Sequence, residues 1–137
     1  MRFLLDTNVV AELRKGRRAS ARVRSWFESL GPDDIRLSVV TIGEIRRGIE
    51  SVRRRDPSAA AALERWLARL VRDHAEAMIP IDLSIAEEWG RLNVPNPLPV
   101  IDGLLAATAH VHGLTLATRN VRDVAGTGVA VVNPFER

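Results

Sequence analysis

The fold is decided by the first ten residues, Met1-Arg2-Phe3-Leu4-Leu5-Asp6-Thr7-Asn8-Val9-Val10. The apolar run Phe3–Leu5 predicts a short buried strand, which stops abruptly at a charged and polar turn. Val9 and Leu13 then lie four residues apart, so a helix is expected after the turn. Asp6 therefore stands at the carboxyl end of the first strand, the edge where ligands bind in open α/β sheets.

Strands and helices are expected to alternate along the rest of the chain. Apolar runs predict four more strands, over residues 35–40, 78–81, 114–117 and 129–132. Apolar residues at helical spacing predict the helices between them, with stripes that include Val23 and Trp26; Ile45 and Ile49; Leu63 and Leu67; Ile85 and Trp89; and Leu104, Leu105 and Thr108. This order predicts a three-layer α/β/α sandwich with a central, mainly parallel five-stranded sheet.

Local signals mark several helix ends. Thr41–Glu44 and Ser84–Glu87 both fit the capping box, so helices are expected to begin at Thr41 and Ser84. Asp56-Pro57 predicts another helix start, and Pro99 stands where a further helix begins. Gly113 is placed to end that last helix.

Length and composition favour one domain over residues 1–137. The chain has 46% apolar and 27% charged residues, an ordinary globular balance. It has no cysteine, which excludes disulfides, thiolate chemistry and cysteine-based zinc sites. No apolar run is long enough for a membrane span, and Asp6 interrupts the first one, so a cytoplasmic protein without membrane contact is expected.

The basic side chains are almost all arginine, because Lys15 is the only lysine among 20 basic residues. Arginine pairs well with phosphates, and the net charge of +3 suits an anionic partner. The base composition of the gene is an equally good reason for this usage. The runs Arg14–Arg18, Arg46-Arg47 and Arg53–Arg55 lack interleaved aromatics and are interpreted mostly as solvated helix ends.

Three acids are expected to meet at one edge of the sheet. Asp6 ends the first strand, Glu44 lies in the first predicted turn after the second, and Asp102 opens the helix that leads into the fourth. Asn120 and Asp123 follow that fourth strand. In a parallel sheet, strand carboxyl ends and the following helix amino ends share one edge, so these side chains are expected to converge.

Each acid also has a purely structural explanation as a helix cap or as a partner of the helix dipole. Clustered carboxylates repel one another unless a cation neutralises them, and Mg²⁺ favours carboxylates together with waters and phosphates. Such ions serve phosphodiester hydrolysis. His74, His110 and His112 fall in predicted helices away from the strand-end turns, so a histidine-based triad has no base at this edge.

Four motifs in order resemble the PIN-domain family, and more closely the VapC toxins of bacterial toxin–antitoxin pairs. They are Leu4–Val9, Ser38–Ile45, Val100–Ala109 and Ala117–Asn120, and the likeness extends to Asn133-Pro134-Phe135. The resemblance implies a PIN-like sandwich and a ribonuclease that depends on Mg²⁺ or Mn²⁺. It also implies a homodimer and a hetero-oligomer with a VapB-type antitoxin.

Carried over by position, Asp6 and Asp102 match the metal-binding aspartates of the family. Glu44 matches its third acid, which is a metal ligand or orients the attacking water. Thr118 would hold Asp6, whereas Arg119 would touch a phosphate or point into solvent.

One position departs from some relatives, which carry an acid where this chain has Asn120. An amide ligates through its oxygen but brings no charge. Asp123 would supply the missing carboxylate if its segment is helical, since positions i and i+3 share a face. A second metal position is therefore left open.

The expected function is the toxin of a toxin–antitoxin system, a metal-dependent endoribonuclease that hydrolyses RNA phosphodiester bonds. The alternative is a catalytically weak PIN domain that binds RNA or protein, which Asn120 motivates. An aspartyl-phosphate phosphatase is a third possibility, but such enzymes usually place a second Asp two residues after the first, where this chain has Asn8.

Overall fold

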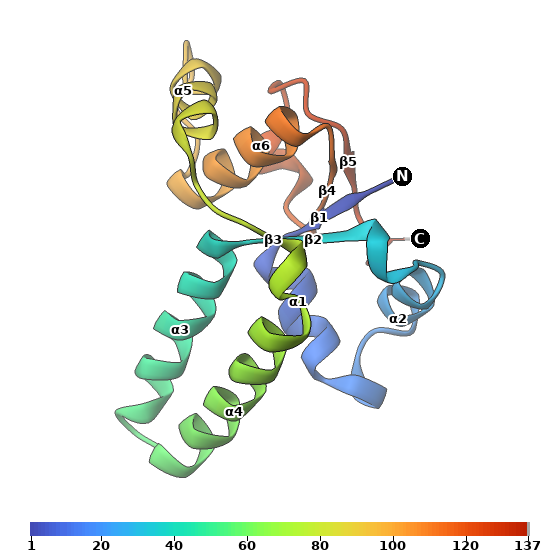
Figure 1. The fold of residues 1–137 in the computed structure, drawn as a ribbon, viewed down its shortest axis with the longest axis vertical. Coiled ribbons are helices and arrows are strands. Elements are labelled where there is room, and N and C mark those ends of the chain that lie inside the picture. Colours follow the sequence, from blue (N-terminus) through green and yellow to red (C-terminus); the bar gives the residue numbers. More distant parts are fainter. Residues whose placement is uncertain (137) are drawn as a thin grey trace.

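The computed structural model describes residues 1–136 and has three layers, with helices on both faces of one sheet (Figure 1). The strands are β1 (Phe3–Leu5), β2 (Ile35–Ser38), β3 (Met78–Ile79), β4 (Thr115–Ala117) and β5 (Val131–Val132). The α-helices are α1 (Thr7–Arg14), α2 (Ala21–Glu28), α3 (Val39–Arg53), α4 (Pro57–Asp73), α5 (Leu83–Leu92) and α6 (Val100–His112). Short 3₁₀ turns are η1 (Gly16–Arg18), η2 (Pro32–Asp34), η3 (Ala75–Ala77) and η4 (Val121–Val124). Across residues 1–136, none of these helices combines the length and apolar character that crossing a membrane requires.

The sheet has five strands in the order β3-β2-β1-β4-β5, and every pairing is parallel. Phe3 of β1 pairs with Ile35 of β2 on one side and with Thr115 of β4 on the other. The opening stretch therefore forms the central strand. The predicted five-stranded parallel sheet in an α/β/α sandwich is confirmed.

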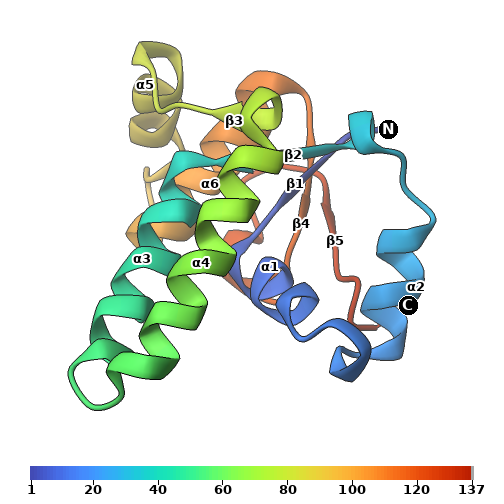
Figure 2. The same cartoon turned by 60° about the horizontal axis from the view of Figure 1, so that its bottom comes forward.

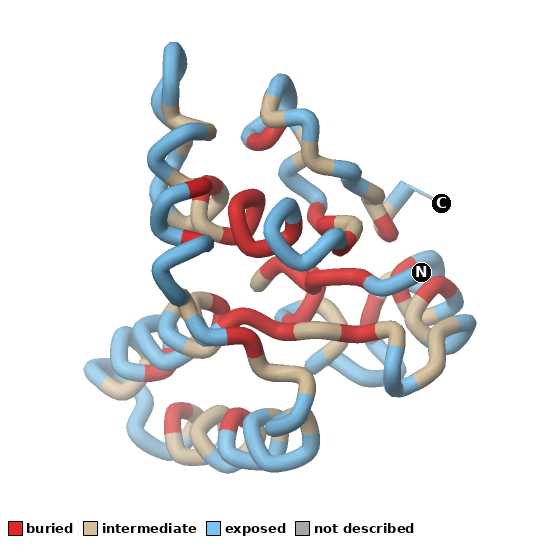
Figure 3. The backbone as a smooth tube through the Cα atoms, turned by 45° about the horizontal axis from the view of Figure 1, so that its top comes forward, coloured by how far each residue is buried: buried red, intermediate tan, exposed pale blue. Residues whose placement is uncertain are grey.

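Side chains of β1 alternate between two cores. Leu4 is fully buried among residues of α5 and α6, including Leu105. Phe3 and Leu5 face the other way and pack with residues of α1 and α2, including Val23. Figure 1 shows α5 and α6 on one side of the sheet and α1, α3 and α4 on the other, and Figure 3 shows the strands between them as largely buried. Burial on both sides explains why β1 reads as a continuous apolar run.

α3 and α4 form a hairpin that projects beyond the sheet (Figures 1 and 2). Its apolar seam contains Ile49, Ala60 and Leu67, all buried. The predicted stripes of the two helices therefore pack against each other, and their opposite faces remain in solvent.

Most strands are shorter than the sequence predicted. The expected strand over 35–40 ends at Ser38, whose hydroxyl accepts the Val40 N–H at 3.0 Å and caps α3. The strand expected over 78–81 ends at Ile79, before Pro80, which has no N–H for a ladder. At the edge of the sheet, β5 covers only 131–132 of the predicted 129–132.

Both capping-box predictions are wrong. α3 begins at Val39 rather than Thr41, and the Thr41 hydroxyl is buried without a hydrogen-bond partner within the described chain. α5 begins at Leu83 rather than Ser84, because Asp82 accepts the Ile85 N–H at 3.0 Å and is the cap. In each case, a polar residue nearer the preceding strand accepts an N–H group of the first turn and so sets the start of the helix.

The other predicted ends are confirmed. Asp56 caps α4 by accepting the Ala59 N–H at 3.1 Å, with Pro57 at the first helical position. α6 begins directly after Pro99. It ends at Gly113, whose φ of 65° is a left-handed conformation that glycine adopts without steric cost.

Candidate active site

An open cleft of about 490 Å³ lies beside the carboxyl ends of β1 and β4. Four separate parts of the chain line it, namely the β1–α1 turn, α3, the start of α6 and the segment after β4. The lining residues are Asp6, Thr7, Asn8, Ala11, Glu44, Pro99, Val100, Ile101, Asp102 and Asn120. The predicted convergence of Asp6, Glu44 and Asp102 is therefore present in the structure.

Asp6 is the most constrained of these acids, with 5% of its surface exposed. Its Oδ1 accepts the Thr7 N–H at 2.6 Å, so Asp6 is the cap of α1 as well as a cleft carboxylate. Its Oδ2 accepts the Thr118 hydroxyl at 2.7 Å and the Asn8 amide at 3.3 Å. Burial raises the pKa of Asp6, and the repulsion from Glu44 adds to the rise, while the hydrogen bonds from Thr118, Thr7 and Asn8 oppose it.

Glu44 reaches the cleft from the second turn of α3, one turn later than predicted, because α3 begins at Val39. The Thr7 hydroxyl donates to Glu44 Oε1 at 2.6 Å, which links the start of α1 to α3. Thr7 is the site residue that sequence reasoning missed. Its position directly after Asp6, in the turn that presents that acid, was the available signal.

Asp102 lies in the first turn of α6, as predicted. Its pKa is raised to about 6, first by burial and then by the neighbouring carboxylates of Asp6, Asp123 and Glu44, with hydrogen bonding to Asp123 adding to the rise. Four carboxyl groups are therefore close enough to influence one another. Such a set is unfavourable when all its members are ionised and becomes favourable when a cation lies among them.

The segment after β4 completes the rim of the cleft. The Asn120 N–H donates to the Thr118 hydroxyl at 2.9 Å, so Thr118 is held while it donates to Asp6. Residues 121–124 form the 3₁₀ helix η4, but Asn120 precedes it with non-helical backbone angles. Asn120 lines the cleft, whereas Asp123 is exposed and lies near Asp102 without lining the cleft. Arg119 does not point freely into solvent, because its guanidinium stacks 4.1 Å from the centre of the Phe135 ring.

The donors around the cleft suit a hard divalent cation. They are carboxylate and amide oxygens, which Mg²⁺ and Mn²⁺ accept as ligands. Over residues 1–136, no three His, Cys, Asp or Glu side chains meet closely enough to form a ready-made metal site. The acids line the cleft but stay too far apart for this, as is expected of carboxylates that repel one another.

The histidines are remote from this cleft, as predicted. His74 caps the carboxyl end of α4, with its Nδ1 3.1 Å from the Leu70 carbonyl. His110 and His112 lie in the last turn of α6, and His110 contacts Glu88 of α5. The described histidines therefore contribute to helix ends and helix packing.

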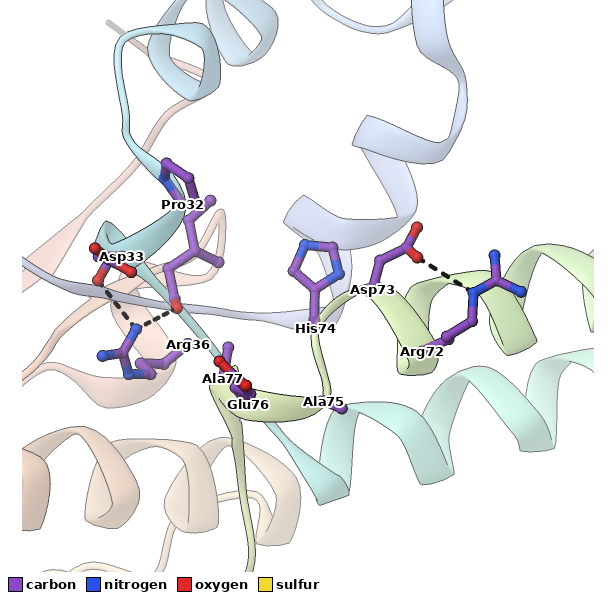
Figure 4. Close-up of a pocket in the computed structure, with 10 residues that line it drawn as sticks. Pro32, Asp33, Arg36, Arg72, Asp73, His74, Ala75, Glu76 and Ala77 are labelled. Atoms are coloured by element: carbon purple, nitrogen blue, oxygen red, sulfur yellow. Dashed lines mark hydrogen bonds and ion pairs between the residues drawn. The ribbon is translucent and has the colours of Figure 1, made fainter.

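A second recess, of about 550 Å³, lies at the amino ends of β2 and β3 (Figure 4). Its two arginines are paired locally. Arg36 donates to the carbonyls of Asp33 and Ile35 at 3.0 and 2.8 Å, and Arg72 pairs with Asp73 at 3.4 Å. Its acids, Asp33, Asp73 and Glu76, are accompanied by these two arginines, whereas no basic side chain of residues 1–136 lines the acidic cleft at the opposite edge, to which the chemistry is therefore assigned.

Comparisons with known proteins agree with this arrangement. The PIN domain family matches residues 3–125. Toxin FitB from Neisseria gonorrhoeae is 31% identical over 97% of this chain and 98% of its own length. VapC ribonuclease Y4jK from Sinorhizobium fredii is 28% identical over 98% of both chains.

Two solved structures are similar along nearly the whole chain. The crystal structure of FitAcB from Neisseria gonorrhoeae has a TM-score of 0.89 at 30% identity and covers 98% of this chain and 99% of its own. A toxin–antitoxin complex from Klebsiella pneumoniae has a TM-score of 0.68 at 28% identity and covers 96% of both chains. With its family match, its parallel sheet and its cleft acids, the chain belongs to the PIN domain family.

Proposed function

We propose that this protein is the toxin of a toxin–antitoxin pair and that it hydrolyses RNA as a divalent-metal-dependent endoribonuclease. The observation that carries the proposal is the convergence of Asp6, Glu44 and Asp102 in one cleft, with the pKa of Asp102 raised to about 6. The ribonuclease and toxin names of the similar proteins support the choice of RNA over other phosphodiesters.

In the proposed site, Asp6, Asp102 and Glu44 hold Mg²⁺ or Mn²⁺, with Asp123 as a further ligand. When bound, the ion supplies an activated water and stabilises the charge that develops on the leaving oxygen. Thr118 holds Asp6 in the orientation that faces the cleft.

Glu44 has a second role in this proposal. It uses Oε1 to accept the Thr7 hydroxyl, so Oε2 is left to orient or deprotonate the attacking water. The Asn120 amide oxygen contributes a neutral donor at the rim. The Arg119 N–H donates to the cleft residue Asn8 at 3.2 Å, and its guanidinium, which is stacked on Phe135, is proposed to meet a substrate phosphate. One or two ions fit this set.

We further propose that residues 1–137 form a single domain that works in the cytoplasm. β5 lies beyond the family match yet pairs with β4, which supports one continuous unit.

A homodimer and a VapB-type antitoxin are the proposed partners. A largely apolar cavity of about 100 Å³ between α1, α2 and α4 supports an apolar partner segment, and its lining includes Phe27, Trp66 and Leu70.

The test is cleavage of cellular RNA by the purified protein with Mg²⁺ or Mn²⁺, compared with EDTA. Asp6→Asn is expected to lose at least 100-fold in rate, because it removes a charged ligand from the cleft. Asp33→Asn removes an equal charge from an exposed site and is expected to cut like the unmodified chain.

Equal cleavage in EDTA, or by Asp6→Asn, would overturn the proposal. RNA binding without cleavage under any divalent ion would favour the alternative, a catalytically weak PIN domain that acts as a binding module.

A further inference from the structure

Two pairs of adjacent arginines, Arg46-Arg47 and Arg53-Arg54, are seven residues apart on α3, with Arg54 as the cap residue at its carboxyl end. The first member of each pair is neutralised. Arg46 contacts Glu64 at 2.6 Å and Glu50 at 3.3 Å, and Arg53 contacts the same two acids at 3.2 and 3.0 Å. These arginines tie α3 to α4 and stay within the hairpin.

The second member of each pair has no acidic partner in residues 1–136. Arg47 and Arg54 are both exposed, and no ion pair joins either of them to a described acid. Glu44 and Glu50 each lie three residues from Arg47, but Glu44 accepts the Thr7 hydroxyl, and the two oxygens of Glu50 contact Arg46 and Arg53. Two exposed cations on one helix are thus left without a partner.

Arg47 and Arg54 share one face of α3. Seven residues are close to two helical turns, so the two side chains leave the helix in nearly the same direction, about 10 Å apart along its axis. Arg47 also lies three residues after Glu44, which puts the pair on the side that faces the acidic cleft. Glu50 and Ser51 lie between them on this face. Glu50 is paired with Arg46 and Arg53, and Ser51 is small and exposed, so no unpaired acid among residues 48–53 separates the two arginines.

The cleft itself cannot hold a polyanion. The carboxyl groups of Asp6, Glu44, Asp102 and Asp123 repel phosphates, and a metal ion offsets this only at the bond being cut. The phosphates on either side of that bond need cations outside the cleft. Exposed, unpaired guanidinium groups that begin one turn from Glu44 meet this need, since arginine pairs with phosphate through two parallel hydrogen bonds.

We propose that Arg47 and Arg54 bind two backbone phosphates of a single-stranded RNA and lead the strand along α3 into the cleft. The identity of the polyanion as RNA rests on the function proposed above. The contacts are to the backbone, so they act on every RNA sequence alike.

The test is the affinity of the full chain for a fluorescein-labelled single-stranded RNA about 12 nucleotides long, measured by anisotropy in EDTA over a series of salt concentrations. Each phosphate contact contributes about 0.7 to the slope of log K against log salt. The Arg47→Gln/Arg54→Gln variant is therefore expected to lower the slope by about 1.4 and the affinity at 0.1 M salt by roughly 25-fold.

Arg17→Gln/Arg18→Gln is the matched control. It removes the same charge from η1, where both side chains are exposed and unpaired among the described residues, and it is expected to keep most of the slope. An unchanged slope in the α3 variant, or an equal drop in the control, would overturn the proposal.

A parallel cleavage assay with Mn²⁺ separates this proposal from the proposed function. If the unmodified chain cuts RNA and the α3 variant binds and cuts equally well, only the proposed role of Arg47 and Arg54 is wrong. If the unmodified chain cuts no RNA but the α3 variant lowers the slope by the expected amount, Arg47 and Arg54 bind RNA and the proposed ribonuclease function is wrong.

Discussion

Asp6 serves both the fold and the cleft, because it ends a buried strand and begins a helix. One carboxylate oxygen caps α1, and the other accepts the Thr118 hydroxyl from across the sheet. Burial raises the pKa of Asp6, while these hydrogen bonds favour its ionised form. The charge that a cation would meet therefore depends on Thr118, which is 1% exposed and lies 112 residues away in sequence.

Thr118→Val is expected to lower the free energy of unfolding by about 1–3 kcal/mol, since it removes the hydrogen bonds to the buried Asp6 carboxylate and from the Asn120 N–H without changing the side-chain shape. The measurement is urea unfolding at pH 7. Thr118→Ser keeps the hydroxyl and serves as the control. If the valine variant were as stable as the serine variant, the Thr118–Asp6 bond would have no role in holding Asp6.

Asp102 predicts a pH dependence of stability. Its pKa rises from an ordinary 3.8 to about 6 on folding, so the folded chain binds an extra proton between these values. The stabilisation from this proton is complete below about pH 4 and is lost as pH rises through 6. At pH 7.5 the ionised Asp102 therefore lowers the free energy of unfolding of the metal-free chain.

Asp102→Asn removes this destabilising negative charge. Its melting temperature is expected to exceed that of the unmodified chain at pH 7.5 in EDTA, and the difference is expected to vanish near pH 4. The measurement is thermal unfolding across this pH range. A difference that grows as pH falls would contradict the assigned direction of the pKa shift.

At the scale of elements, the packing of α5 on α6 sets where Asp102 lies. A Cβ at Gly103 would come within 3.1 Å of the Trp89 indole nitrogen and 3.4 Å of Leu98 Cβ, so this turn of α6 has space only for glycine or a small side chain. Gly48 of α3 is the opposite case, because a Cβ there would meet nothing within 4 Å.

Gly103→Val is therefore expected to destabilise the chain by about 1–3 kcal/mol through overpacking. Gly48→Ala is expected to stabilise it by about 0.5–1 kcal/mol through helix propensity alone. Both are measured by urea unfolding. A Gly103→Val variant as stable as the unmodified chain would show that the contact between α6 and Trp89 is not tight at this point.

The sequence predicted the kind and order of the elements, because buried apolar runs and helical stripes are strong signals. It did not predict their ends. Thr41–Glu44 looked like a capping box, but Ser38 caps the helix from the end of β2. Several polar residues near a helix start can accept the same N–H groups, and the course of the preceding strand decides which of them becomes the cap.

The acids of the cleft were predictable because topology alone brings strand ends and helix starts to one edge. The hydrogen bonds that hold the acids were less so. Thr7 donates to Glu44 across 37 residues, a contact that depends on the angle between α1 and α3. No periodic pattern in the sequence predicts the angle between these two helices.

At the scale of the whole molecule, the sheet separates two cores and opens its carboxyl edge to a single acidic cleft. The α3–α4 hairpin projects from that edge (Figure 2). Arg47 and Arg54 of this hairpin are exposed. The net charge of +3 and these exposed arginines favour an anionic partner, while the cleft itself is acidic.

The most direct test of this view is a calorimetric titration of the metal-free chain with Mn²⁺ at pH 7.5. The unmodified chain is expected to bind the ion, and Asp6→Asn and Asp102→Asn are each expected to weaken binding at least tenfold, while Asp33→Asn binds normally. Equal Mn²⁺ affinity in the unmodified chain and in an Asp6→Asn/Asp102→Asn double variant would contradict a metal site in this cleft.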